Sequence, residues 1–394
     1  MDREAQYLLH LLGAFLRQAQ PEDPGELDWD KLLQLSKIHT VSGILGYMAM
    51  SWSICPDRER KAELRGACLA TIDVYNRRGA LADQLLERLN TAGIDHIVMK
   101  GYVFRECYPV PELRTYGDID LVIRPEDRQK CNELMLSLGY RLDHDWEPVY
   151  SYLRQDEFYE IHTQIMEIDV SDKANHRDYF DSAWDYVRLK SGHSYRFTPE
   201  FHFLYMITHI AKHVVSSGAG ARMYLDVAAF IRHLGASLDW GYIRQELEQL
   251  RLADFTNIVL TLTQRCFGVE SPLPLVPIQE TTWNDFLEFT MAGGIFGRIG
   301  RDSGTNSLTA QNRSEEGISR IGTVVKRLFP SAKTIENRYT YLQDKPWLLP
   351  AAWIHRLVKT SDTWQQHTQE AQGIMSADLD RVRKIKELYT QLGL

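Results

Sequence analysis

The chain has 394 residues, a formal net charge of −8 at pH 7 and a hydrophobic content of 44%. This length allows two or three domains with ample hydrophobic cores, and the ordinary apolar content excludes a chain that is disordered throughout. The acidic balance argues against a nonspecific nucleic-acid binder, whose affinity would come from a basic surface. We therefore expect no nucleic-acid partner.

The cysteines and the N-terminus are typical of a protein in a reducing compartment. The five cysteines lie far apart and form no Cys-x-x-Cys pair, so they predict neither a zinc site nor a disulfide framework. The first residues, Met-Asp-Arg-Glu, lack the basic region of a signal peptide. No run approaches the roughly 20 apolar residues that a membrane-spanning helix requires. We expect a cytoplasmic protein without a membrane span.

Residues 1–92 show helical patterns. Apolar residues recur at helical spacing over residues 4–19, and Asp28 is placed to cap a second helix. A further helix carries leucines at a spacing of four and ends at Gly93, a natural C-cap. We predict an N-terminal helical region that packs on the rest of the chain and steadies it.

From residue 94 the pattern changes to that of an α/β unit. A helix is predicted from Pro125 to Leu138, closed by Gly139. Several connections are too short for a parallel crossover, so we expect a mixed sheet. We assign this core to residues 93–190. Its predicted strands cover residues 94–99, 118–123, 140–142, 149–153 and 158–165.

Two aspartates stand at the start of the second predicted strand. Asp118 and Asp120 lead into the apolar run 121–123, and residues i and i+2 of a strand project from the same face. Two carboxylates aimed at one point repel each other unless a cation lies between them. Mg²⁺, which binds carboxylates together with substrate phosphates, suits this position. The pair therefore favours metal-assisted phosphoryl or nucleotidyl transfer.

An Asp-x-Asp tripeptide also occurs by chance at strand ends, so the prediction depends on its surroundings. Gly117 allows a backbone or ligand to approach closely just before the pair. Glu160 and His162 repeat the i, i+2 spacing on a later strand, and Glu160 can supply a third carboxylate. If Glu160 faces away from the pair, Glu167 or Asp169 is the substitute.

After about residue 190 the chain turns helical again, and we assign residues 191–394 to a C-terminal helical region. A helix from Pro199 places His202, His209 and His213 close to one face. His209 and His213 have metal-ligand spacing, but the zinc-protease glutamate is missing because position 210 is Ile. Either these histidines face the active-site cleft or they are ordinary hydrogen-bonded packing residues.

Two further features of this region are predicted. Arg222 and Asp226, four residues apart, form an intrahelical ion pair in the simplest interpretation. The segment 293–317 is rich in Gly, Ser, Asn and Thr and is the best candidate for a flexible loop.

The motifs together resemble an uncharacterised bacterial nucleotidyltransferase family of the DNA polymerase β-like superfamily, and the resemblance covers most of the chain. The residues that carry it include Lys100-Gly101, Leu113-Arg114, Gly117 to Leu121 and Glu160-Ile161-His162. The resemblance implies an α+β fold with a small αβα core flanked by helical regions. It also implies divalent metals, Mg²⁺ or Mn²⁺, on Asp118 and Asp120, and a third acid, Glu160, on the neighbouring strand.

One departure concerns the phosphate grip. The superfamily usually opens with Gly-Ser on a helix, whereas this chain has Lys100-Gly101 further ahead of the aspartates. We expect a rebuilt grip, in which Lys100 or Arg114 supplies positive charge. Gly101, Gly117 and His162 complete the predicted nucleotide-binding set, with His162 orienting Glu160.

The sequence thus predicts a metal-dependent nucleotidyltransferase that uses a nucleoside triphosphate such as ATP. Its acceptor is not specified and could be a small molecule, a peptide or a protein. Two alternatives stay open. One is a nucleotide-binding or regulatory, antitoxin-like protein with this fold and little turnover. The other is an enzyme that keeps the metals but transfers a different phosphoryl group.

Overall fold

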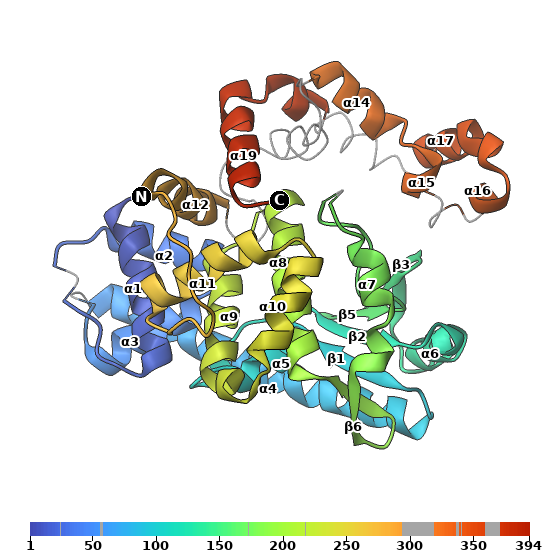
Figure 1. Cartoon of the computed structure of the whole chain (residues 1–394). Helices are drawn as coiled ribbons and strands as arrows, with labels where there is room; N and C mark the ends of the chain where they lie inside the picture. Colours follow the sequence, from blue (N-terminus) through green and yellow to red (C-terminus); the bar gives the residue numbers. More distant parts are fainter. Residues whose placement is uncertain are drawn as a thin grey trace.

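The computed structural model has an α+β architecture in which a mixed sheet is flanked by helices on both sides (Figure 1). The predicted flexible loop lies, apart from Gly293, outside the described residues. In the part of the chain that the structure describes, no helix is long and apolar enough to cross a membrane. The described residues are 1–23, 25–55, 58–171, 173–216, 218–293, 319–335, 339, 341–358 and 371–394.

In the described part of the chain four helices precede the sheet, and the ends of α2 and α4 follow the capping signals in the sequence. Asp28 caps α2 by accepting hydrogen bonds from the backbone of Asp30 and Lys31. Gly93, just after α4, adopts the positive φ of +64° that ends many helices. The helices are α1 (Arg3–Arg17), α2 (Trp29–Ile38), α3 (Ser42–Trp52) and α4 (Arg58–Thr91).

The sheet has seven strands in the order β3-β4-β5-β2-β1-β7-β6. It is mixed, as predicted, because β2 is antiparallel to β1 but parallel to β5. The last two strands were not predicted, and they carry the sheet past residue 190. The division of the chain at residues 92 and 190 stays a prediction. The strands are β1 (His96–Met99), β2 (Ile119–Ile123), β3 (Arg141–Trp146), β4 (Val149–Arg154), β5 (Glu157–His162), β6 (Val187–Ser191) and β7 (Ser194–Phe197).

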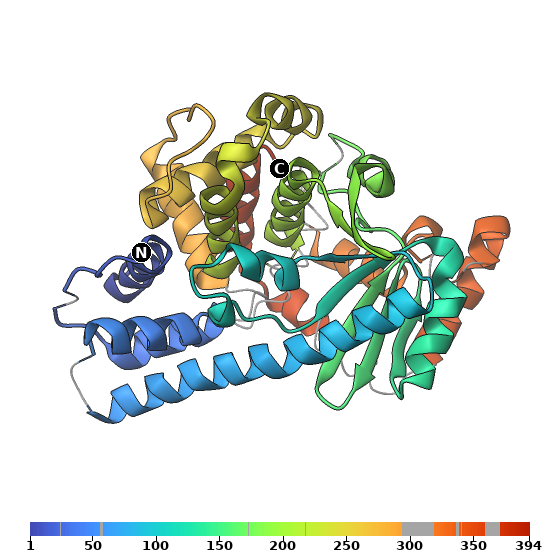
Figure 2. The ribbon, with the colours of Figure 1, turned by 90° about the horizontal axis from the view of Figure 1, so that it is seen from below.

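Each face of the sheet belongs to a different core. On one face, side chains such as Leu121 and Ile161 pack in a cluster with α4 and with α6 (Arg128–Ser137). Figure 2 shows α4 running along this face. On the other face, Met99 and Val122 join a larger cluster with the helices that follow the sheet. The alternating direction of strand side chains thus divides the core in two.

Among those later helices, α8 lies between the sheet and α9 to α11 (Figures 1 and 2). The described elements outside the sheet also include the short α5 (Gly101–Phe104), which follows β1 directly. The later helices are α7 (His176–Asp181), α8 (Pro199–Ser216), α9 (Ala221–Leu234), α10 (Trp240–Gln249), α11 (Ala253–Phe267), α12 (Glu280–Gly293), α14 (Arg320–Leu328), α15 (Ala332–Ile335), α16 (Tyr341–Asp344), α17 (Leu349–Val358) and α19 (Leu379–Gln391).

Candidate active site

The parallel pairing of β2 with β5 brings the acidic residues together. Asp120 lies opposite Glu160 in the register, and Val122 lies opposite His162. Glu160 and His162 project from the same face of β5 because they are two residues apart. One ligand atom from each of Asp120, Glu160 and His162 lies within 4.8 Å of the other two. Asp118, predicted as a metal ligand, precedes β2 and is not in this group, although the charges of Asp120 and Glu160 act on its carboxyl. We refer to Asp118, Asp120, Glu160 and His162 together as the acid cluster.

Asp120 is the buried centre of the acid cluster. Its side chain is only 2% exposed, and its Oδ1 accepts hydrogen bonds from Lys100 Nζ at 2.5 Å and from His162 Nε2 at 3.0 Å. Burial alone would raise the pKa of Asp120, but the Lys100 charge and the His162 hydrogen bond hold it below its ordinary value. Asp120 is therefore charged at neutral pH.

His162 contacts two carboxylates of the acid cluster directly, Asp120 and Glu160. Burial lowers its pKa, but hydrogen bonds to Asp120 and Glu160 outweigh this and raise the pKa of His162 above its ordinary value. Its Nε2 lies 3.5 Å from Glu160 Oε2, while its Nδ1 has no hydrogen-bond partner among the described residues. His162 thus bridges the two carboxylates.

Asp118 has a different electrostatic environment from Asp120. Burial and the neighbouring charges of Asp120 and Glu160 raise the pKa of Asp118 to about 6, although Lys100 opposes this. Lys100 and His162 thus stabilise the charge of Asp120, whereas burial and the neighbouring acids disfavour a charge on Asp118. Carboxylate oxygens, with water or phosphate oxygens added, suit Mg²⁺ and Mn²⁺. The residues present fit a divalent cation.

Lys100 reaches Asp120 from a strained turn between β1 and α5. Its backbone has φ +55° and ψ −133°. Residues other than glycine rarely adopt this conformation, which costs about 1–3 kcal/mol. The next residue must be small, since a Cβ on Gly101 would lie 2.2 Å from Arg114 Nη1. The Lys-Gly pair therefore places the ammonium at the acid cluster and makes room for an arginine.

Arg114 does not contact the acid cluster, although it was predicted to bind phosphate. Its Nη2 and Nε donate to Asp226 of α9 at 2.6 and 3.1 Å, and both side chains are 6% exposed. Tyr108 also donates to Asp226, at 2.7 Å. A phosphate could engage this guanidinium only by breaking a buried bidentate pair, which is costly. Arg114 is better described as a support for the loop before Asp118.

The predicted ion pair between Arg222 and Asp226 is wrong. Asp226 is occupied by Arg114 and Tyr108, whereas Arg222 Nη1 donates to the carbonyl and the hydroxyl oxygen of Thr115, at 2.8 and 2.9 Å. Proximity along one helix suggested the pair, but a residue more than one hundred positions away supplies the stronger partner.

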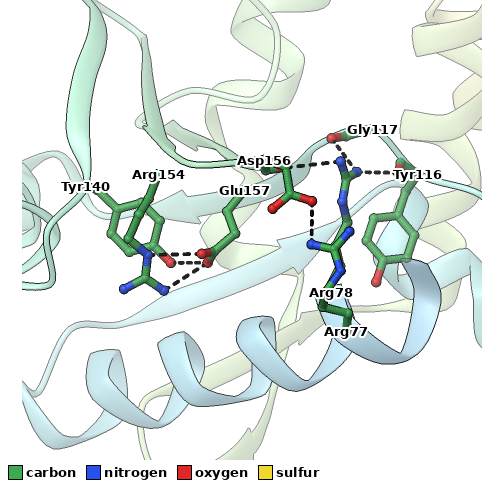
Figure 3. Close-up of polar contacts among 8 residues, drawn as sticks. All are labelled: Arg77, Arg78, Tyr116, Gly117, Tyr140, Arg154, Asp156 and Glu157. Atoms are coloured by element: carbon green, nitrogen blue, oxygen red, sulfur yellow. Dashed lines mark hydrogen bonds and ion pairs between the residues drawn. The ribbon is translucent and has the colours of Figure 1, made fainter. Parts of the chain in front are cut away.

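A residue that the sequence did not single out, Arg78 of α4, joins the approaches to both acid-bearing strands (Figure 3). It donates to the carbonyls of Tyr116 and Gly117, each at 2.9 Å, and to the carbonyl of Asp156 at 3.1 Å. Gly117 precedes Asp118, and Asp156 precedes β5. No local pattern could reveal this role, because an arginine on a long polar helix is ordinary.

The three histidines of α8 have two separate environments. His202 is buried against Phe104, with ring centroids 4.7 Å apart, and burial lowers its pKa to about 3. His209 and His213 form a pair, with their Nε2 atoms 3.0 Å apart. Burial lowers the pKa of both, and the charge of Lys100 lowers it further. Both imidazoles are therefore near enough to Lys100 for its charge to act on them.

Comparisons with known proteins can now be set beside this geometry. The sequence model of a family described as uncharacterised nucleotidyltransferase matches residues 25–268. No curated protein matches the chain. The solution structure of the antibiotic-resistance factor ANT(2'')-Ia aligns with 43% of this chain and 90% of its own, at 15% identity and a TM-score of 0.31. The family match covers more than half of the chain, so the chain belongs to the uncharacterised nucleotidyltransferase family.

Proposed function

We propose that the protein transfers a nucleoside monophosphate from a nucleoside triphosphate to a hydroxyl-bearing acceptor, with a divalent metal at the acid cluster. Family membership supports nucleotidyl transfer as the reaction class. The observation that carries the finer proposal is the set of Asp120, Glu160 and His162 ligand atoms within 4.8 Å of one another. Burying several ionisable groups in contact costs free energy, and such groups cluster at functional sites. A bound metal would lower this cost.

Asp118, Asp120 and Glu160 are the residues that would hold Mg²⁺ or Mn²⁺. When bound, the metal would offset negative charge on the attacking and leaving oxygens. The raised pKa of Asp118 agrees with this assignment, because a cation would offset both the burial of this carboxyl and its repulsion by Asp120 and Glu160. His162 would orient Glu160 and keep its own charge beside Asp120.

The reaction itself exchanges one oxygen on phosphorus for another. The acceptor hydroxyl oxygen forms a bond to the α-phosphorus, and the bond from that phosphorus to the bridging oxygen of pyrophosphate breaks. Glu160, whose side chain is 26% exposed, takes the hydroxyl proton. Lys100 contributes positive charge next to Asp120, where a phosphate oxygen would bind.

The test is a search for metal-dependent products. The protein is incubated with Mg²⁺ or Mn²⁺ and each α-labelled triphosphate, alone and with cell extract, and pyrophosphate and labelled acceptor are measured. We expect both products to appear together and to vanish with EDTA and in Asp118→Asn. Absence of pyrophosphate with every triphosphate and both metals, in the presence of extract, would contradict the proposal.

A second candidate is a nucleotide-binding protein with little turnover. The observation that favours it is the direct contact of Lys100 with Asp120, since an ammonium there can neutralise the carboxylate without a metal. The same assay separates the candidates, because this one predicts triphosphate binding that persists in EDTA and yields no pyrophosphate.

A further inference from the structure

A nucleoside triphosphate bound at the acid cluster needs cationic side chains for its phosphates, and neither Lys100 nor Arg114 is sufficient alone. Arg114 is committed to Asp226, and Lys100 lies on Asp120. A triphosphate carries several charges, and a single ammonium already paired with a carboxylate is a weak partner for them. Another cation should therefore lie beside the acid cluster.

Arg222, at the start of α9, has the properties of that cation. Among the described residues no carboxylate lies within ion-pairing distance of it, and its only hydrogen bonds go from Nη1 to Thr115. Its Nε is buried without a hydrogen-bond partner in the described part of the chain. The Arg222 guanidinium therefore has a donor that no described residue satisfies, and it shares the nearby charge of Asp226 with Arg114, which is unfavourable by itself.

Arg222 lies beside the loop that leads to Asp118 and β2. Thr115, which it holds, lies three residues before Asp118 in the loop that leads into β2. Burial and the nearby Arg114 charge lower the pKa of Arg222 to about 10, and the charges of Asp226 and, more weakly, of Asp118 act against them. The charge of Arg222 in turn helps to lower the pKa of His213. Arg222 thus contacts the loop before Asp118 and is near enough to His213 for its charge to affect the pKa of that residue.

We propose that Arg222 binds the β- and γ-phosphates of the nucleoside triphosphate, taking the role for which Arg114 was expected. The inference rests on the proposed function, and it names the residue that binds the pyrophosphate leaving group of that reaction. A guanidinium offers a planar pair of donors that matches two phosphate oxygens. Its Nε is buried and has no hydrogen-bond partner in the described part of the chain, so the guanidinium would have to turn toward the phosphate to make this contact.

The alternative is that Arg222 only fastens α9 to the aspartate loop. Two variants separate these roles. Arg222→Gln removes the charge, whereas Thr115→Val removes one of the two oxygens that Arg222 contacts and leaves the guanidinium in place. Arg232, exposed near the end of the same helix, gives a matched control in Arg232→Gln.

The experiment measures dissociation constants by calorimetry with full-length protein, using Mg²⁺ with a non-hydrolysable triphosphate, the monophosphate and inorganic tripolyphosphate. Melting temperature without ligand reports folding. We expect Arg222→Gln to weaken triphosphate and tripolyphosphate binding about tenfold or more and to leave monophosphate binding unchanged. Thr115→Val and Arg232→Gln should weaken triphosphate binding less than Arg222→Gln does. Arg222→Lys should recover part of the loss, because it restores the charge but not the planar donors.

Wild-type triphosphate affinity in folded Arg222→Gln, or an equal loss for monophosphate, would overturn the assignment. The test also separates this inference from the proposed function. Pyrophosphate release by Arg222→Gln with an unchanged KM would leave the proposed function standing and remove Arg222 from it. Tripolyphosphate binding that depends on Arg222, in a protein that releases no pyrophosphate, would support the phosphate site and contradict the proposed function.

Discussion

The two faces of the sheet use the same strands for opposite purposes. Leu121 and Asp120 are neighbours on β2, with side chains 0% and 2% exposed. Leu121 points into an apolar cluster with α4 and α6, whereas Asp120 contacts Lys100 and His162 on the other side. A buried carboxylate is far more costly than a buried leucine. Equal burial with such different cost indicates that one face is selected for folding and the other for chemistry.

The largest expected effects follow from removing either aspartate. We expect Asp118→Asn and Asp120→Asn each to lower turnover by about 10³-fold or more, because both remove charge that the transition state requires. Their stabilities should differ in sign. Asp120→Asn leaves Lys100 and His162 short of a buried anion and destabilises the fold by about 2–4 kcal/mol. Asp118→Asn relieves repulsion and stabilises it.

The measurements are turnover at saturating Mg²⁺ and urea unfolding of the metal-free protein. Near wild-type turnover in either variant would show that the acid cluster is not the catalytic site. A loss of stability in Asp118→Asn equal to that in Asp120→Asn would show that the two aspartates share one environment, against their opposite pKa shifts.

The opposite face should respond in the reverse way. Leu121→Ala removes a fully buried side chain and should destabilise the fold by about 2–5 kcal/mol. Turnover per folded molecule should stay within a few-fold of wild type, because Leu121 points away from the acid cluster. Chemical unfolding and kinetics at a temperature where the variant is folded check this. A 10³-fold loss of turnover in the folded variant would break the distinction between the faces.

A pH prediction concerns His202. Its folded pKa of about 3 lies below the ordinary value of 6.5, so the neutral form is favoured by folding. Stability from this group is fully present above about pH 6.5 and is lost as the pH falls toward 3, by at most about 1.4 kcal/mol per unit. His202→Leu should flatten the stability profile between pH 6.5 and 4.5. An unchanged slope would mean that His202 is not the group responsible.

A substitution of Lys100 tests whether its charge, on the face of the sheet that carries the acid cluster, contributes to triphosphate binding. Lys100→Met keeps most of the side chain and removes the charge, so we expect KM for the triphosphate to rise about tenfold, or about 1.4 kcal/mol. If the contact forms to the departing pyrophosphate, kcat falls as well. Lys100→Gly should lose the same charge but unfold at a higher temperature than Lys100→Met, because it releases the strained backbone. Unchanged kinetics in both variants would leave Lys100 a purely structural residue.

The smallest effect is expected for Arg78, which acts on the acids only through the backbone. Arg78→Ala frees the carbonyls of Tyr116, Gly117 and Asp156 and should lower kcat several-fold with little change in KM. Among the described residues, its neighbour Arg77 pairs only with the exposed Asp156 carboxylate, and it provides the control, with an expected change below about 1 kcal/mol. Equal effects of the two substitutions would remove the positioning role.

Sequence patterns predicted the parts of this site that depend on local periodicity. The two-residue repeat predicted that Glu160 and His162 share one face of their strand, and ligand atoms of both lie within 4.8 Å of Asp120; the placement of Asp118 in this site stays a prediction. The cap at Asp28 followed from the same kind of local rule. These features depend on residues that are close in the chain, so a sequence contains them directly.

Features set by distant contacts or by weak patterns were missed. The strands β6 and β7 lie at the sheet's edge, where β6 is largely exposed and shows no apolar alternation. The helix α3 is apolar nearly throughout and contains two glycines, so it has little helical periodicity. The choice of Arg114 over Arg222 as the partner of Asp226 depends on how α9 meets the loop before β2, and no local rule contains that information.

The most direct test of the central claim is the position of Mn²⁺ in crystals grown with a non-hydrolysable triphosphate. Its anomalous scattering locates the metal without assumptions about the acceptor. The account predicts a peak within bonding distance of Asp118, Asp120 and Glu160 carboxylate oxygens, with the phosphate chain directed toward Arg222. A peak elsewhere, or none at saturating Mn²⁺ with the triphosphate bound, would contradict it.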